Sequence, residues 1–279
     1  MNRRRFGMKS YIKDNSIIFD EADNLNLALT LDCGQAFRWI QKPNGAWHAV
    51  VSGRAVDITQ DGERITVIGD TDEHFWRTYL DLDRDYGTIC EKLKTDRWLN
   101  RAIKEYSGIR ILRQDTWEAL CSFIISQNNN IPRIKGIIER LCTAFGDDLG
   151  NGDFGFPSAE RLAKCSVDDL APLRSGFRAK YIIDAAQKVA GGAIDLDILT
   201  TENMDVCRAE LIKIKGVGAK VAECTLLYGC GRIEAFPVDV WVKRIMAELY
   251  PEGLPECTFG IEGIAQQFLF HWRRNTETI

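Results

Sequence analysis

Residues 211–222 read LIKIKGVGAKVA and carry the strongest structural signal in the chain. Its apolar positions are spaced so that one helix packs on the next: Leu211, Ile214, Val217, Val221 and Ala222. Gly216 and Gly218 permit a tight turn with positive φ and close approach of another backbone. The stretch therefore predicts a helical hairpin near residues 205–230.

The second helix of this hairpin is expected to start at about Gly218, with its free backbone N–H groups pointing outward. Such groups suit a DNA phosphate, so Gly216, Val217 and Gly218 are candidate phosphate contacts. This is the pattern of the helix-hairpin-helix motif. An ordinary hairpin with a glycine cap is the alternative, and many helix-hairpin-helix proteins only bind DNA.

Lys220 adds chemistry to the hairpin. It lies in the first turn of the second helix, where the helix dipole disfavours a charged amine. A partly desolvated cleft would favour the neutral amine further, and a neutral amine can attack a sugar carbon. A surface lysine at a helix start is the alternative interpretation.

Asp239 follows in the segment Ala235-Phe236-Pro237-Val238-Asp239 and precedes an apolar helix at residues 240–249. It is a good N-cap, and a carboxylate held by backbone N–H groups stays ionised. Such a group can stabilise positive charge on a reacting sugar. One helix and a loop separate it from Lys220, so the two side chains can meet.

Upstream, residues 16–69 carry strand signals. The pair Asp61-Gly62 predicts a turn between strands at 56–59 and 65–68, and Asn44-Gly45 predicts one between 37–40 and 47–51. A helical period begins near residue 73 with Phe75, Trp76, Tyr79 and Leu80. The sequence thus predicts an α+β fold, with a β-rich N-terminal domain at 1–112 and an all-helical domain at 113–279.

Several helix boundaries can also be predicted. Pro132 suits the first turn of a helix that runs toward Phe145 and stops at Gly146. Helix N-caps are expected at Asp115, Ser158, Ser166, Asp205 and Asp239.

Composition sets limits on function. The 279 residues carry a net charge of −4, which argues against a DNA binder that relies on basic side chains, but not against one that uses helix N-termini. No apolar run reaches the roughly 18 residues of a membrane span, and no apolar segment follows the basic start at Arg3–Arg5 as in a signal peptide. Those arginines could contact a phosphate backbone or form a solvated tail.

The nine cysteines are scattered singly, with no C-x-x-C pair. This pattern indicates reduced thiols in a protein that is not secreted, and it disfavours zinc and iron–sulfur sites. No metal and no cofactor is expected.

Four segments together resemble the 8-oxoguanine DNA glycosylase/AP lyase family of the helix-hairpin-helix glycosylase superfamily. The first is 216–224 with 237–240, the second 34–39 (GQAFRW), the third 126–133 (SQNNNIPR) and the fourth 176–181 (GFRAKY). The matches run from about residue 25 to 275. The resemblance implies an antiparallel β-domain beside a helical region, base flipping, and excision of an oxidised purine followed by β-elimination.

The resemblance also implies roles for single residues. Lys220 matches the Schiff-base lysine and Asp239 the catalytic aspartate. The predicted base-recognition pocket consists of Gly34, Cys224, Gln266 and Phe270. Asn128 is predicted to fill the gap left by the extruded base, and Phe177 to wedge the duplex. Arg133 and Arg178 are predicted to read the opposite cytosine. Gly34 matches the glycine whose carbonyl accepts a hydrogen bond from the protonated ring nitrogen of 8-oxoguanine, where guanine has a lone pair.

Three positions depart from the family pattern. Ala36 stands where serine is frequent, Trp241 where a histidine thought to touch phosphate is frequent, and Phe177 where tyrosine is common. The family's strand contacts and opposite-base preference are therefore not carried over in detail to these positions, whereas the lysine–aspartate pair is unaffected.

The expected partner is double-stranded DNA containing oxidised guanine, bound by a monomer, in the bacterial cytoplasm at the nucleoid or in a eukaryotic nucleus. Three alternatives remain. The first is a glycosylase for alkylated purines, which commonly keeps the aspartate without the lysine, and the second is a non-catalytic helix-hairpin-helix protein. The third is a metal or iron–sulfur protein, which the scattered cysteines disfavour.

Overall fold

An antiparallel sheet forms the first part of the computed structural model, which describes residues 9–276. Arg3–Arg5 therefore lie outside the described residues. The sheet has the strand order β1-β2-β6-β5-β4-β3. Its strands are β1 (Lys9–Lys13), β2 (Ser16–Asp20), β3 (Ile40–Gln41), β4 (Trp47–Val51), β5 (Arg54–Asp61) and β6 (Arg64–Ile68).

The two predicted hairpins are present. Asp61 pairs with Arg64 across the turn between β5 and β6, and Gly45 has a φ of +87° in the turn between β3 and β4. The strand predicted at 37–40 is wrong except for its last residue. In a strand, Phe37 and Trp39 would lie on one face, but Phe37 packs among the helices whereas Trp39 packs under the sheet.

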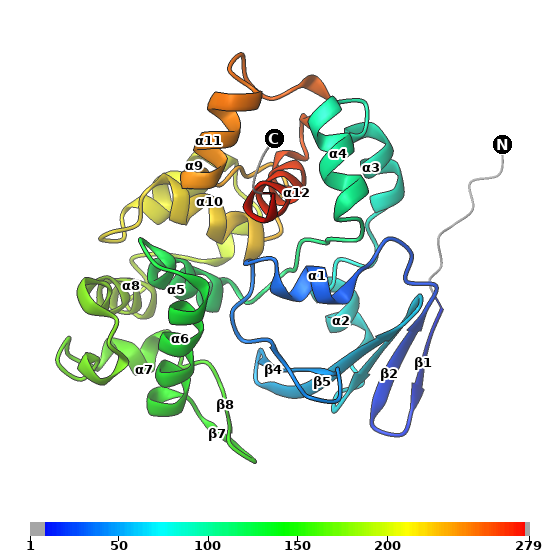
Figure 1. The fold of residues 1–279 in the computed structure, drawn as a ribbon. Coiled ribbons are helices and arrows are strands. Elements are labelled where there is room, and N and C mark those ends of the chain that lie inside the picture. Colours follow the sequence, from blue (N-terminus) through cyan, green and yellow to red (C-terminus); the bar gives the residue numbers. More distant parts are fainter. Residues whose placement is uncertain (1–8, 277–279) are drawn as a thin grey trace.

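Helices dominate the rest of the described chain (Figure 1). They are α1 (Leu27–Asp32), α2 (Glu73–Tyr79), α3 (Tyr86–Leu93), α4 (Arg97–Glu105), α5 (Thr116–Ser126), α6 (Ile131–Phe145), α7 (Ala159–Ala163), α8 (Ala179–Ala190), α9 (Met204–Ile212), α10 (Ala219–Tyr228), α11 (Val240–Leu249) and α12 (Glu262–Asn275). A small hairpin of β7 (Asp148–Gly150) and β8 (Asp153–Phe154) follows α6. Short 3-10 helices lie at Ala171–Leu173, Gly176–Arg178, Asp197–Thr200 and Glu256–Thr258. The predicted α+β class is confirmed.

Most of the predicted helix boundaries are confirmed. The side chains of Asp115, Ser158 and Asp239 each accept a hydrogen bond from the first turn of their helix, and α6 begins with Pro132 in its first turn and ends at Gly146. Two caps are wrong. Asn203 caps α9, with Asp205 two residues inside it, and Ser166 starts no α-helix because it bonds Asp169 within an isolated turn.

Two buried clusters organise the molecule. The smaller lies between the sheet and helices α1 and α2, and the larger joins the helices from α3 onward. Figure 1 shows the sheet at one side, with α12 between α4 and α11. Residues 86–111 contribute to the helical cluster, whereas Leu112 packs in the sheet cluster. The domain boundary at residue 112 stays a prediction. No helix between residues 9 and 276 has both the length and the apolar composition needed to cross a membrane.

Candidate active site

The hairpin formed by α9 and α10 is built as its apolar pattern predicts. Leu211, Ile214, Val217, Val221 and Ala222 are all buried. Gly216 has a φ of +81°, and a Cβ at this position would lie 2.4 Å from the ring of Tyr181. Glycine is therefore required here both by the backbone conformation and by the close contact with α8.

Gly218 begins the second helix where the sequence predicts, but in a different backbone conformation. Its φ is −106°, so the positive φ expected there is wrong. A Cβ at Gly218 would meet nothing within 4 Å. The residue is the N-cap of α10 and provides no side-chain hydrogen bond. The first backbone N–H groups of α10 consequently lie beside open space, where an anion can approach them.

Lys220 is half-buried in the first turn of α10. Its Nζ donates a hydrogen bond to Oγ of Ser126 at 2.9 Å and lies 5.0 Å from the ring centre of Phe123. Both partners belong to α5, which packs directly against α10. An aromatic ring and one hydroxyl thus fix the direction of the amine.

Asp239 is fixed by the first turn of α11. Its Oδ1 accepts hydrogen bonds from the backbone N–H groups of Trp241 at 2.9 Å and Val242 at 2.8 Å. Its Oδ2 makes no hydrogen bond within residues 9–276, so this oxygen is available to a substrate. The N-cap role and a catalytic role are compatible because they use different oxygens.

One cavity of about 340 Å³ brings these groups together. Four predicted site residues line it: Gly34, Lys220, Asp239 and Phe270. Its volume falls within the roughly 300–1,000 Å³ of small-molecule sites. The sequence missed other lining residues, including Phe37, Phe123, Ser126, Trp241 and Arg274.

Gly34 lies at the wall of the cavity in a conformation that favours glycine. Its φ is +90°, and a Cβ would lie 3.3 Å from the side chain of Ile131 and 3.7 Å from the ring of Phe270. The positive φ sets the direction of the adjoining peptide groups. Of the predicted pocket residues, Gly34 and Phe270 therefore line the same cavity, one from the α1–β3 connection and one from α12.

The other two predicted pocket residues, Cys224 and Gln266, are buried and are not among the residues that line the cavity. Burial raises the pKa of the Cys224 thiol to about 11, and the nearby Lys220 opposes that rise. Gln266 lies 3.5 Å from the hydroxyl of Tyr228, which donates a shorter hydrogen bond of 2.6 Å to Gln267. In the free protein neither side chain lines the cavity that holds Lys220.

The four predicted opposite-base and wedge residues form a second group. Asn128 has a φ of +46° between α5 and α6. Arg178 is buried, and its guanidinium donates to the carbonyls of Asn128 and Ser175 at 2.9 and 3.1 Å and to that of Gln127. Phe177, 47% exposed, lies against this guanidinium, whose carbon is 4.4 Å from the ring centre.

Arg133 completes this group. Its Nη2 donates to the carbonyl of Arg174 at 3.3 Å, and it is exposed. Burial lowers the pKa of Arg178, and the charge of Arg133 lowers it further. None of the four lines the cavity that holds Lys220, although Asn129 and Asn130, next to Asn128, do. Among residues 9–276, no group of three or more His, Cys, Asp or Glu side chains is placed to hold a metal ion.

Comparison with known families gives two matches that adjoin each other. Residues 16–120 match the 8-oxoguanine DNA glycosylase N-terminal domain. Residues 121–253 match the HhH-GPD superfamily of base excision DNA repair proteins. The second match contains both Lys220 and Asp239.

Individual relatives agree with these matches. A Saccharomyces cerevisiae N-glycosylase/DNA lyase is 34% identical over 257 residues, which cover 81% of this chain and 68% of the relative. MBOgg1, solved in complex with a low affinity DNA ligand, superimposes with a TM-score of 0.90 at 41% identity, covering 95% of this chain and 98% of that one. The Clostridium acetobutylicum 8-oxoguanine glycosylase/lyase, solved with double-stranded DNA containing cytosine opposite 8-oxoG, gives 0.89 at 34% identity, covering 95% and 97%.

Proposed function

Because this chain belongs to the 8-oxoguanine DNA glycosylase family, we propose that it excises 8-oxoguanine from double-stranded DNA and cleaves the strand at the resulting abasic site. The observation that carries the proposal is the position of Lys220 and Asp239 on one cavity large enough for a nucleobase. An amine and a carboxylate on one cavity supply a nucleophile and a counter-charge.

The first chemical step joins the enzyme to the sugar. The damaged nucleotide rotates out of the duplex into the cavity, at a cost of a few kcal/mol for unstacking. The neutral amine of Lys220 bonds to the anomeric carbon of the deoxyribose as the bond to the base breaks. The base leaves with the bonding electron pair and takes up a proton. Asp239 stabilises the positive charge that develops on the sugar.

The second step cleaves the strand. The sugar ring opens to give a Schiff base with Lys220, which acidifies the neighbouring sugar carbon. Loss of a proton from that carbon expels the 3′ phosphate by β-elimination. Water then hydrolyses the Schiff base and restores the free amine. Each step uses groups of this chain, DNA and water.

Recognition of the lesion is assigned to the residues around the cavity. The carbonyl of Gly34 accepts a hydrogen bond from the ring N–H that 8-oxoguanine has and guanine lacks. Guanine has a lone pair at this nitrogen, which the carbonyl oxygen would repel. Phe270 lines the cavity and offers a face for stacking. Cys224 and Gln266 are buried in the free protein, so the pocket has to extend to them for both to contact the base.

Strand binding is assigned to two places. The first turn of α10, with Gly216, Val217 and Gly218 before it, binds a phosphate through backbone N–H groups. Phe177 is exposed and separates the base pairs as a wedge. Asn128 fills the gap left by the extruded base, and Arg133 and Arg178 read the orphaned cytosine. To bind the base, Arg178 must give up its hydrogen bonds to backbone carbonyls. Binding is therefore favourable only with a base that accepts hydrogen bonds in their place.

We further propose that the protein acts as a monomer on the DNA of the nucleoid or nucleus. The monomeric state is checked by sedimentation of the free protein and of its DNA complex. A measured molecular mass twice that of one chain would contradict the monomeric state.

A substrate panel tests the proposed function. The protein is incubated with duplexes that carry 8-oxoguanine opposite cytosine, 8-oxoguanine opposite adenine, 3-methyladenine, or no lesion. The proposal expects release of 8-oxoguanine and strand cleavage, fastest opposite cytosine. Release of the alkylated base alone would instead indicate an alkylpurine glycosylase, and binding without release of any base would indicate a non-catalytic protein.

A further inference from the structure

The loop between α10 and α11, residues 229–239, determines where Asp239 lies relative to Lys220. Lys220 belongs to a helix, whereas Asp239 is at the end of eleven residues without regular structure. A displacement of about 1 Å between reacting groups can cost two orders of magnitude in rate. The contacts that fix this loop to α10 are therefore important for any chemistry that needs both groups.

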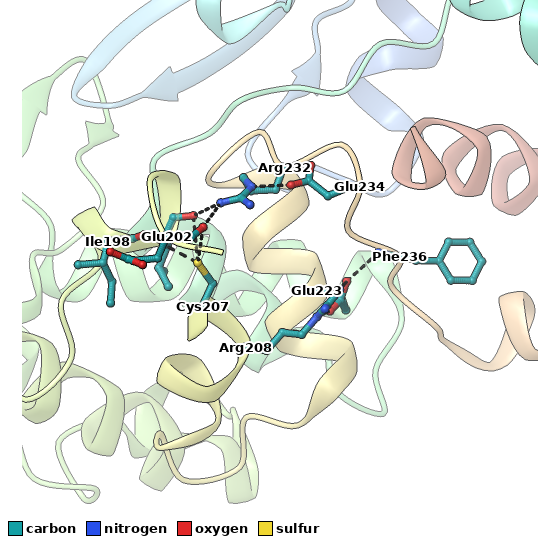
Figure 2. Close-up of polar contacts among 9 residues, drawn as sticks. Ile198, Glu202, Cys207, Arg208, Glu223, Arg232, Glu234 and Phe236 are labelled. Atoms are coloured by element: carbon teal, nitrogen blue, oxygen red, sulfur yellow. Dashed lines mark hydrogen bonds and ion pairs between the residues drawn. The ribbon is translucent and has the colours of Figure 1, made fainter. Parts of the chain in front are cut away.

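One buried carboxylate makes such a contact (Figure 2). Glu223 is 8% exposed. Its Oε2 accepts a hydrogen bond of 2.7 Å from the backbone N–H of Phe236. Its Oε1 accepts one of 2.5 Å from Nε of Arg208, on α9. A single side chain of α10 thus joins both neighbouring segments, α9 and the loop.

The two ends of this connection lie close to the catalytic pair in the sequence. Glu223 follows Lys220 by three residues on α10, so the two side chains are neighbours on the helix surface. Phe236 precedes Asp239 by three residues, and Pro237 between them has a restricted φ and is buried. Fixing the N–H of Phe236 therefore fixes a short, stiff segment that ends at Asp239.

Other contacts hold the earlier part of the loop. Nε of Arg232 donates to Glu234 at 2.7 Å, and its Nη1 donates to the carbonyl of Glu202 at 2.8 Å. The N–H of Gly263 donates to the carbonyl of Ile233 at 2.8 Å. These contacts tie residues 232–234 to the segment before α9 and to α12, as Figure 2 shows for Arg232 and Glu202. The contact of Glu223 lies nearer to Asp239 and leads back to the helix that carries Lys220.

We propose that Glu223 is a positioning residue, which holds Asp239 at its working distance from Lys220 through the backbone of Phe236. This inference rests on the proposed function of the lysine–aspartate pair. Arg208 neutralises the carboxylate, so that Glu223 acts through geometry and adds no uncompensated charge beside the amine. Glutamine at 223 would place its NH₂ group against either Arg208 or the N–H of Phe236. Both are donors, so one of the two hydrogen bonds would be lost.

The experiment is a double-mutant cycle of Glu223→Gln and Asp239→Asn. Single-turnover release of 8-oxoguanine is measured for the wild type, both single variants and the double variant, and DNA affinity is measured by anisotropy. Asp205→Asn is the matched control, because Asp205 is an exposed carboxylate on the same Arg208 with no contact to the loop.

If Glu223 positions Asp239, Glu223→Gln slows excision by about 10- to 100-fold at unchanged DNA affinity. In the Asp239→Asn background it has less than about a twofold effect, since the positioned group is already gone. Asp205→Asn stays close to the wild type. Arg208→Met gives a second variant of the same connection if Glu223→Gln fails to fold.

Multiplicative effects in the double variant, or wild-type excision by a folded Glu223→Gln protein, overturn the inference. Because both results require an active wild type, they leave the proposed function standing. A wild-type protein that releases no 8-oxoguanine overturns the proposed function instead, and the inference with it.

Discussion

Nζ of Lys220 donates to Oγ of Ser126 at 2.9 Å, and the same Oγ donates to the carbonyl of Phe123 at 2.8 Å. Because its single proton is used for Phe123, the hydroxyl of Ser126 can only accept from the amine. The lone pair of a neutral Lys220 must therefore point away from Ser126. The last residue of α5 thus orients the nucleophile.

Replacing Ser126 with alanine should slow base release. A hydrogen bond of this kind contributes about 1 kcal/mol, so we expect roughly a fivefold slower single-turnover rate with DNA affinity unchanged. Ser122→Ala, one turn earlier on α5, is the control. An unaltered rate in Ser126→Ala would show that the amine needs no orientation from this hydroxyl.

The two glycines of the hairpin should respond differently to alanine. At Gly216, a Cβ would lie 2.4 Å from the ring of Tyr181 at a φ of +81°. Such a clash and the strained backbone typically cost about 1–3 kcal/mol each. Gly216→Ala should lower the midpoint of thermal unfolding by several degrees. An unchanged midpoint would mean that the hairpin relaxes freely.

Gly218→Ala should lower the unfolding midpoint less than Gly216→Ala, since a Cβ there meets nothing within 4 Å and the φ is −106°, and only the weaker N-cap preference of alanine acts. If the backbone before α10 approaches a DNA phosphate, the added methyl group instead weakens binding to undamaged and damaged duplexes alike. Anisotropy titration at fixed salt measures this. Normal affinity in Gly218→Ala would place the phosphate elsewhere.

Arg274 lines the cavity, and within residues 9–276 its guanidinium makes no hydrogen bond or ion pair. We expect it to bind a phosphate of the everted nucleotide. Arg274→Ala should then reduce the slope of log affinity against log salt by about one. Arg273→Ala is the matched control, because Arg273 already pairs with Glu248 at 3.3 Å. Equal salt slopes in both variants would contradict this role.

Glu118 should make stability depend on pH. Burial raises its pKa from 4.5 to about 7, although Arg38 lies 3.8 Å away. Well below pH 4.5 the group is protonated in both states. As the pH rises from 4.5 to 7 the unfolded chain ionises first, so this group lowers the free energy of unfolding by up to about 3 kcal/mol.

Denaturant unfolding of the wild type and Glu118→Gln at pH 4.5, 5.5 and 7 measures this contribution. The difference in unfolding free energy should shift in favour of the variant as the pH rises. Glu139→Gln, at an exposed position on α6, is the control. A difference that stays constant with pH would rule out the raised pKa.

Local signals in the sequence predicted the hairpin, the β-domain and most helix starts, because apolar spacing and capping residues act within a few positions. They failed where distant packing decides. Phe37 and Trp39 alternate like strand residues, yet they serve two different cores. Gly216 has a positive φ and no room for a Cβ, so the fold requires glycine there. Gly218 has a negative φ and open space around it, so the fold itself does not require glycine there.

The sequence pattern and the resemblance together predicted the site only in part. Gly34, Lys220, Asp239 and Phe270 line one cavity as expected. Ser126 and Glu223 were missed because their contacts with Lys220 and Phe236 join segments 94 and 13 residues apart. Spacing along the chain does not encode such contacts. The roles of the predicted residues stay predictions until variants are measured.

If Lys220 becomes covalently bound to the lesion's sugar, borohydride reduction traps the two as a stable adduct. The wild type is mixed with an 8-oxoguanine duplex and reduced, and the adduct is digested and located by mass spectrometry. We expect a deoxyribose remnant on the peptide containing Lys220 and no adduct in Lys220→Gln. An adduct on another residue, or full trapping by Lys220→Gln, would rule out Lys220 as the nucleophile.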